Sequence, residues 1–213
     1  MKLKKSNYYL MELKKCSFME VVYMTRIYFV RHAQPIHSWQ EDSTRPLTKE
    51  GITDSKKVVE TLANIKLDYC VSSPYKRSLD TIKECAKNHG LEIHTDYRYR
   101  ERECGNKNTR EMIIKRWLDF DFHEEGGESL NMVQRRNMEG VTELLLEHEN
   151  ENILFGTHGT ALSTILNYYD STYNFDSFWR IIDFMPYIVC LEFDGTKCLG
   201  KKEILIIKKE FKD

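Results

Sequence analysis

From Thr25 onward, short apolar runs alternate with segments of helical periodicity, and this alternation constrains the fold more than any other feature. Four runs have the apolar character of strands: Arg26–Val30, Tyr69–Val71, Leu91–His94 and Asn152–Phe155. Strands that alternate with helices pair in parallel and are covered by helices on both faces. The pattern therefore predicts an α/β fold, a three-layer α/β/α sandwich with a mostly parallel central sheet.

The segments between these runs carry the start signals of helices. Thr48 is a candidate N-cap for a helix that begins with Lys49, and Ser73-Pro74 places a proline in the first turn of the next helix. Three more helices are predicted at Glu111–Leu118, Ser129–Glu149 and Thr160–Tyr169. Near the C-terminus, Asp194-Gly195 separates two apolar runs, which predicts an antiparallel hairpin at the edge of the sheet.

The N-terminal segment differs from the rest of the chain. Residues 1–24 are rich in lysine and have no uninterrupted apolar stretch of the kind found in signal peptides. We expect a poorly ordered extension, or residues upstream of the true start at Met24, ahead of one domain formed by residues 25–213. A short helix that packs on a partner or on a membrane surface is the alternative.

The charge balance and the cysteines limit the partners of the chain. There are 32 basic and 33 acidic residues, a net charge of −1, so no bulk attraction to nucleic acid or to an anionic membrane is expected. No apolar run approaches the ~18 residues of a membrane span. The six cysteines form no CxxC pair, which favours a reducing compartment and a cytoplasmic location.

Charged and polar residues follow three of the predicted strands at the point where each strand ends. Arg31-His32-Ala33 follows the first strand, Ser72–Arg77 the second, and Gly156–Gly159 the last parallel strand. The C-terminal ends of parallel strands share one edge, where open α/β sheets hold their ligands. Arginine repels metal cations and binds oxyanions, and the N–H groups at the start of the next helix, around Thr160, suit an anion. The arrangement predicts a phosphate or carboxylate site.

The order of these motifs resembles the histidine phosphatase superfamily, the phosphoglycerate-mutase-like fold. Six elements spread over roughly residues 26–193 match that family's pattern in sequence order: Arg31-His32-Ala33, Pro46–Gly51, Ser72–Thr81, Arg100–Gly105, Gly127–Leu130 and Thr157–Gly159. The resemblance implies a histidine phosphatase-like domain that acts on a small phosphorylated substrate and requires no metal and no other cofactor.

The resemblance also implies a role for each matched residue. Catalytic residues would be His32 as the nucleophile, Glu101 as the general acid and His158 as a second donor to the phosphoryl oxygens. Arg31 and Arg77 would neutralise the phosphoryl group and orient it. Glu103 is the alternative acid, but the family's acid lies four residues before a glycine, and Gly105 then points to Glu101.

Departures from the family pattern leave the substrate open. Ser38 stands where many relatives carry asparagine, and its hydroxyl offers a phosphate one donor where the amide offers two. The basic residues of the middle segment are interpreted as a solvated helix face rather than a second phosphate site: Lys107, Arg110, Lys115 and Arg116.

The sequence thus favours a phosphatase of the histidine acid phosphatase type. A phosphoglycerate-mutase-type phosphoryl transferase and a non-catalytic module that binds a phospholigand or a protein are the alternatives. A homodimer is compatible with the sequence.

Overall fold

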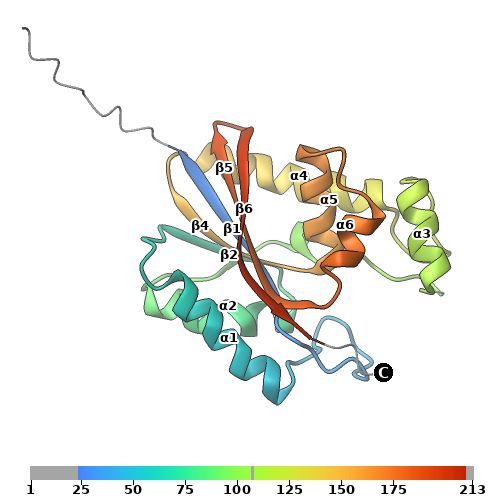
Figure 1. Ribbon diagram of the computed structural model, residues 1–213, viewed down its shortest axis with the longest axis horizontal. Coiled ribbons are helices and arrows are strands. Elements are labelled where there is room, and N and C mark those ends of the chain that lie inside the picture. Colours follow the sequence, from blue (N-terminus) through green and yellow to red (C-terminus); the bar gives the residue numbers. More distant parts are fainter. Residues whose placement is uncertain (1–23, 107, 210–213) are drawn as a thin grey trace, which may run out of the picture.

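The computed structural model describes residues 24–106 and 108–209, so all but the last residue of the predicted extension 1–24 lies outside the described part. Its strands form one sheet in the order β3-β2-β4-β1-β5-β6. The strands are β1 (Thr25–Arg31), β2 (Tyr69–Ser72), β3 (His94–Thr95), β4 (Asn152–Thr157), β5 (Phe184–Asp194) and β6 (Lys197–Lys208). The first four are parallel, and β5 and β6 form the antiparallel hairpin (Figure 1). The predicted sheet, with its C-terminal edge hairpin, is confirmed.

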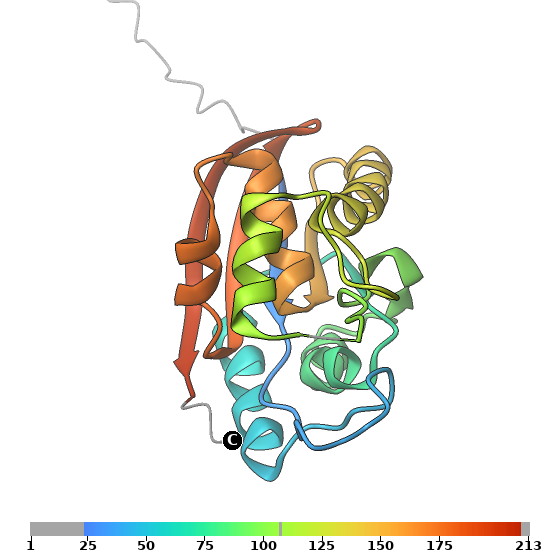
Figure 2. The same ribbon diagram turned by 90° about the vertical axis from the view of Figure 1, so that its right-hand side faces the viewer.

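Helices cover both faces of the sheet. They are α1 (Lys49–Leu62), α2 (Lys76–Asn88), α3 (Arg110–Leu118), α4 (Leu130–Glu147), α5 (Gly159–Tyr169) and α6 (Phe175–Arg180), with a short 3-10 helix at Tyr97–Tyr99. Helices α1 and α2 pack on one face of the sheet. Helices α4 and α5 pack on the other face, and α3 and α6 lie on the side of α4 and α5 (Figure 2). The expected three-layer sandwich is therefore present. Within the described residues, no helix is both long enough and apolar enough to cross a bilayer.

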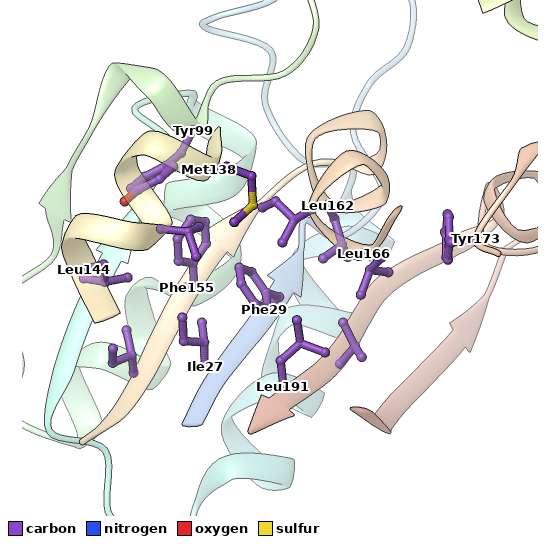
Figure 3. Close-up of a cluster of buried hydrophobic side chains, with 14 of the residues drawn as sticks. Ile27, Phe29, Tyr99, Met138, Leu144, Phe155, Leu162, Leu166, Tyr173 and Leu191 are labelled. Atoms are coloured by element: carbon purple, nitrogen blue, oxygen red, sulfur yellow. The ribbon is translucent and has the colours of Figure 1, made fainter. Parts of the chain in front are cut away.

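The core divides into two clusters because the side chains of a strand alternate between the faces of the sheet. From β1, Phe29 points toward α4 and α5, where its ring centroid lies 4.8 Å from that of Phe155 and Leu162 packs nearby (Figure 3). Val30 points to the opposite face and packs with Val58 of α1 in the second cluster. Burial on both faces explains why β1 is a continuous apolar run.

Helix α2 begins three residues later than the sequence predicts. The predicted start, Ser73-Pro74, stays outside the helix because the Oγ of Ser73 accepts a hydrogen bond from the backbone N–H of Tyr75 at 3.2 Å. Tyr75 itself has an extended backbone, with φ −69° and ψ 133°. The first turn therefore starts at Lys76, and the hydroxyl of Ser73 is kept for the site described below.

Two other elements also differ from the prediction. The third strand is not Leu91–His94 but only His94–Thr95, because β2 offers partners to these two residues alone. Leu91 instead packs against the core cluster under α2. The six-residue helix α6 was not predicted, and it is capped by the side chain of Asn174, which accepts hydrogen bonds from two backbone N–H groups.

The strand register brings the ends of β1, β2 and β4 to one level. Arg31 lies opposite Thr157, and the N–H of His32 donates to the carbonyl of Thr157 at 3.1 Å. In the same way, the N–H of Ser73 donates to the carbonyl of Gly156 at 3.0 Å. The residues that follow the three strands therefore meet at the C-terminal edge of the sheet.

Candidate active site

A cavity of about 220 Å³ opens at this edge of the sheet. Five of the seven predicted site residues line it: Arg31, His32, Arg77, Glu101 and Thr160. The other two do not lie on its wall. His158 is fully buried, and Ser38 is exposed on the loop after β1. The structure therefore brings together the two arginines, the first histidine and the acid, but not Ser38.

The two ring nitrogens of His32 differ in their surroundings, because only Nδ1 contacts a backbone carbonyl. Its Nδ1 lies 2.8 Å from the carbonyl oxygen of Ala33. A carbonyl can only accept, so Nδ1 carries the proton of the neutral ring and Nε2 carries the lone pair. Burial, together with the charges of Arg77 and Arg31, holds the pKa of His32 well below its usual value. The ring is neutral at ordinary pH, as a nucleophile must be.

The two arginines beside His32 are buried and held by different partners. Nη1 of Arg31 donates to the backbone carbonyls of Ile181 and, at 3.3 Å, of Phe184. Burial lowers the pKa of Arg31 to about 10, so the guanidinium remains charged at neutral pH. Arg77 donates to Asp42 twice, to its carbonyl at 2.6 Å and to its carboxylate at 3.2 Å. Two buried, charged guanidinium groups therefore face one cavity.

His158 lies behind His32 rather than on the cavity wall. Its Nε2 is 2.7 Å from the Oγ of Ser73, and the centroids of the two imidazole rings are 5.3 Å apart in an edge-on arrangement. Burial and the charge of Arg77 lower the pKa of His158 well below its usual value. The Nδ1 atom of His158 is buried and has no hydrogen-bond partner within the described residues.

The carboxylate of Glu101 occupies the N-terminus of α5. Its Oε2 accepts from the backbone N–H of Thr160 at 3.1 Å, and its Oε1 accepts from the N–H groups of Ala161 at 3.2 Å and Arg102 at 2.7 Å. The sequence predicts that the N–H groups around Thr160 bind a phosphate. This expectation is corrected, because in the structure these N–H groups donate to the carboxylate of Glu101, the predicted acid. The alternative acid, Glu103, is exposed, lies off the cavity wall and pairs with Arg100 at 3.1 Å.

The loop that carries Glu101 is fixed from behind by an ion pair between Arg136 and Glu128. Arg136 donates to both carboxylate oxygens of Glu128, at 2.9 and 2.8 Å, and to the carbonyls of Arg98, Arg100 and Glu101. Burial by itself raises the pKa of Glu128, but hydrogen bonds from Arg136 and from the N–H of Glu103 outweigh it, and the pKa is lowered. The Gly127–Leu130 motif thus supports the motif that contains the acid.

The Pro46–Gly51 motif supports the other side of the site. Thr48 caps α1, and its backbone N–H donates to the carbonyl of Gln34, two residues after His32, at 3.0 Å. A Cβ at position 51 would lie 2.3 Å from that same carbonyl oxygen, so only glycine allows α1 to approach the loop. The motif therefore positions the loop that leaves the nucleophile.

Several residues of the site were not foreseen, and four of them are described here. Asp42, Arg102 and Arg116 lie on the cavity wall, and Arg136 holds the acid loop. Arg116 was interpreted as part of a solvated helix face, and this is wrong, because it is 3 % exposed. Its burial depends on the packing of α3 against the loop after Glu101, for which the sequence carries no short-range signal. Within the described residues, no group of three or more His, Cys, Asp or Glu side chains is placed to hold a metal ion.

Comparison with known proteins matches most of the chain to one family. The family model of the histidine phosphatase superfamily (branch 1) matches residues 27–201. A probable phosphoglycerate mutase, GpmB, of Proteus mirabilis is 27% identical over 162 residues, which cover 68% of this chain and 74% of that protein. Phosphoserine phosphatase 1 of Hydrogenobacter thermophilus is 28% identical over 150 residues, which cover 63% and 71%.

The fold is shared with solved structures as well. A mycobacterial glucosyl-3-phosphoglycerate phosphatase superposes with a TM-score of 0.69 at 17% identity, over 87% of this chain and 100% of that one. The family model covers most of the chain, and it spans every motif described above except part of the first strand. The chain therefore belongs to the histidine phosphatase superfamily, branch 1.

Proposed function

We propose that this protein hydrolyses a small phosphomonoester through a covalent phosphohistidine on His32. The observation that carries the proposal is the contact between Nδ1 of His32 and the carbonyl of Ala33 at 2.8 Å. It leaves Nε2 as the nucleophilic atom of a neutral ring in a cavity that two buried arginines line. Membership of the family and the similarity to a phosphoserine phosphatase support the same reading.

In the first step, Arg31 and Arg77 bind the phosphoryl dianion, which would otherwise repel a nucleophile. The lone pair of Nε2 of His32 forms a bond to phosphorus while the bond between phosphorus and the alcohol oxygen breaks. Glu101 gives its proton to the departing oxygen. The products are a free alcohol, phosphohistidine and a Glu101 carboxylate.

In the second step, water replaces the alcohol. The carboxylate of Glu101 takes a proton from the water, whose oxygen attacks phosphorus as the bond to Nε2 breaks. Inorganic phosphate leaves, and His32 returns to its neutral form. In this scheme the arginines neutralise the phosphoryl charge, so the reaction requires no metal ion.

We assign His158 a donor role toward the phosphoryl oxygens, as the family pattern implies. Its place behind His32 and its contact with Ser73 support a position next to the reacting group. The sequence-based predictions of a cytoplasmic location and of a homodimer stay predictions, as does the absence of nucleic-acid and membrane partners.

Steady-state hydrolysis of a generic aryl phosphate tests the proposal. We expect measurable turnover by the native chain, loss of it in His32→Ala, and a strong loss in Glu101→Gln but not in Glu103→Gln, which serves as the matched control. The reverse ranking of the two glutamate variants would reassign the acid. A native chain that binds phosphate without turnover would support the non-catalytic module instead.

Mutase activity is the second candidate, favoured by the similarity to GpmB. A mutase returns the phosphoryl group from His32 to a second hydroxyl before water attacks. Exchange of a label between the phosphate positions of a phosphoglycerate, with stimulation by added bisphosphate, would identify it. Release of all the label as inorganic phosphate is the result that our proposal predicts.

A further inference from the structure

Ser73 follows β2 directly and contacts the active site without lining its cavity. It is fully buried, and the proposed reaction gives it no part. Its Oγ lies 2.7 Å from Nε2 of His158 and accepts a hydrogen bond from the backbone N–H of Tyr75 at 3.2 Å. A buried hydroxyl also has a proton of its own to donate, and this proton determines the direction of the contact with His158.

The hydroxyl proton of Ser73 has a single acceptor available to it. Among the residues that the structure describes, Nε2 of His158 is the only acceptor within hydrogen-bond distance of this Oγ. If Nε2 carried a proton, the Oγ would accept from both His158 and Tyr75, and its own proton would be buried without a partner. Burying an unpaired donor is costly. The Ser73 hydroxyl therefore donates to Nε2, which carries the lone pair of the ring.

This direction assigns the tautomer of His158. Burial and the charge of Arg77 keep the ring neutral, because they hold its pKa well below the usual value. A neutral imidazole has one N–H, so a lone pair on Nε2 places the proton on Nδ1. Nδ1 is buried and has no hydrogen-bond partner in the described part of the chain. The ring therefore holds an N–H donor that these residues leave unpaired.

The contact with Ser73 also decides which nitrogen of His158 can serve the reaction. Because Ser73 occupies Nε2, a hydrogen bond from the ring to a phosphoryl oxygen has to come from Nδ1. In the opposite tautomer Nδ1 would be an acceptor, and its lone pair would face negatively charged oxygens. The ring centroids of His158 and His32 are 5.3 Å apart, which places the second histidine beside the group that reacts with the first.

We propose that Ser73 is a positioning residue, which fixes His158 as the Nδ1–H tautomer and thereby makes it a donor to the phosphoryl group. The inference rests on the proposed function, in which His158 donates to the phosphoryl oxygens. The competing explanation is structural: Ser73 only shapes the turn before α2, through its contact with Tyr75. The two explanations differ in what happens to the His158 ring when the hydroxyl is removed.

Nitrogen-15 NMR of the imidazole rings reads the tautomer directly, in the ligand-free native chain at mildly alkaline pH. We expect a protonated Nδ1 and an unprotonated Nε2 for His158, with its signals identified by their loss in His158→Ala. In Ser73→Ala this preference should be lost, whereas His32 should keep its own protonated Nδ1 and so report a folded site. The matched control is Ser78→Ala, which removes a buried hydroxyl paired with another serine at 3.0 Å and should leave His158 unchanged.

A double-mutant cycle measures the consequence for turnover of an aryl phosphate. We expect Ser73→Ala to lower kcat about 10- to 100-fold with little change in KM, because the Nδ1–H donor acts mainly as charge develops in the transition state. Ser78→Ala should keep a kcat close to that of the native chain. In the His158→Ala background, Ser73→Ala should cause no further loss, because it acts only through that ring.

A protonated Nε2 of His158 in the native chain would overturn the inference without any Ser73 variant, even if Ser73→Ala does not fold. An unchanged tautomer in a folded Ser73→Ala protein would overturn it in favour of the structural explanation, as would equal losses of kcat with and without His158. Failure of the proposed function would appear separately, as a native chain that has the expected tautomer but does not hydrolyse an aryl phosphate.

Discussion

Replacing Arg136 by methionine removes the main support of the acid loop while it keeps the volume of the side chain. The change deletes the ion pair with Glu128, whose two partners have side chains only 12% and 11% exposed, and three hydrogen bonds to backbone carbonyls of residues 98–101. Glu128 keeps Arg100 as a partner, at 2.8 Å. Glu101 loses the donor that holds its carbonyl.

The magnitude follows from the burial of this pair. Removing one partner of a buried ion pair costs about 3–5 kcal/mol, because the other charge stays buried without compensation. Since Arg100 remains beside Glu128, we expect the lower end, about 3 kcal/mol in the free energy of unfolding. For a domain of this size that corresponds to a drop of about 6–12 °C in the melting temperature. Turnover should also fall, because the acid is no longer fixed.

Urea unfolding and steady-state hydrolysis of an aryl phosphate measure the two effects. The matched control is Arg135→Met, which changes the preceding, exposed residue of α4 and should shift stability by about 0.5 kcal/mol or less. If Arg136→Met unfolds like the native chain, or if it is destabilised with full turnover, the reasoning that links this ion pair to the acid is wrong.

Three other predictions concern the rest of the site. Asp42→Asn removes the carboxylate that competes with a ligand for Arg77. Because the Asp42 side chain is 40% exposed, we expect inorganic phosphate to inhibit only about two- to fivefold more strongly. Weaker inhibition would mean that Asp42 orients Arg77 for the ligand. His32 and His158 stay neutral in the fold, so below pH ~6.5 the unfolded chain binds protons that the native chain does not. As the pH decreases below that value, the free energy of unfolding falls by up to about 1.4 kcal/mol per pH unit for each histidine. His32→Asn should reduce this slope, and an unchanged slope would contradict a neutral His32 in the fold. Gly51→Ala places a Cβ 2.3 Å from a backbone oxygen and should cost about 1–3 kcal/mol in thermal or urea unfolding, whereas native-like stability would show that α1 can shift freely.

The local part of the fold was predictable from the sequence. The cap at Thr48, the parallel strands and the hairpin depend on short-range patterns of polarity and turn residues, and the structure contains them. The start of α2 was not predictable in this way, because a hydrogen bond from Tyr75 and a contact with His158 keep Ser73 out of the helix. Tertiary contacts there outweigh the local preference of proline for the first turn.

The site residues were likewise predictable only where they depend on local patterns. Arg31, His32 and Arg77 were predicted to meet because they lie at the end of a parallel strand or in the first turn of the next helix. The sequence does not place Arg116 or Glu124, because their burial arises only when α3 packs against the acid loop. The parts of the site that follow a strand end are therefore visible in the sequence, and the parts that line the far end of the cavity are not.

The most direct test of the central claim is the mass of the protein after brief incubation with a phosphomonoester and denaturing quench. Our account predicts an adduct of one phosphoryl group that is labile in acid, maps to His32 and is absent from His32→Ala. Substrate turnover that survives His32→Ala, or an adduct on any other residue, would contradict it.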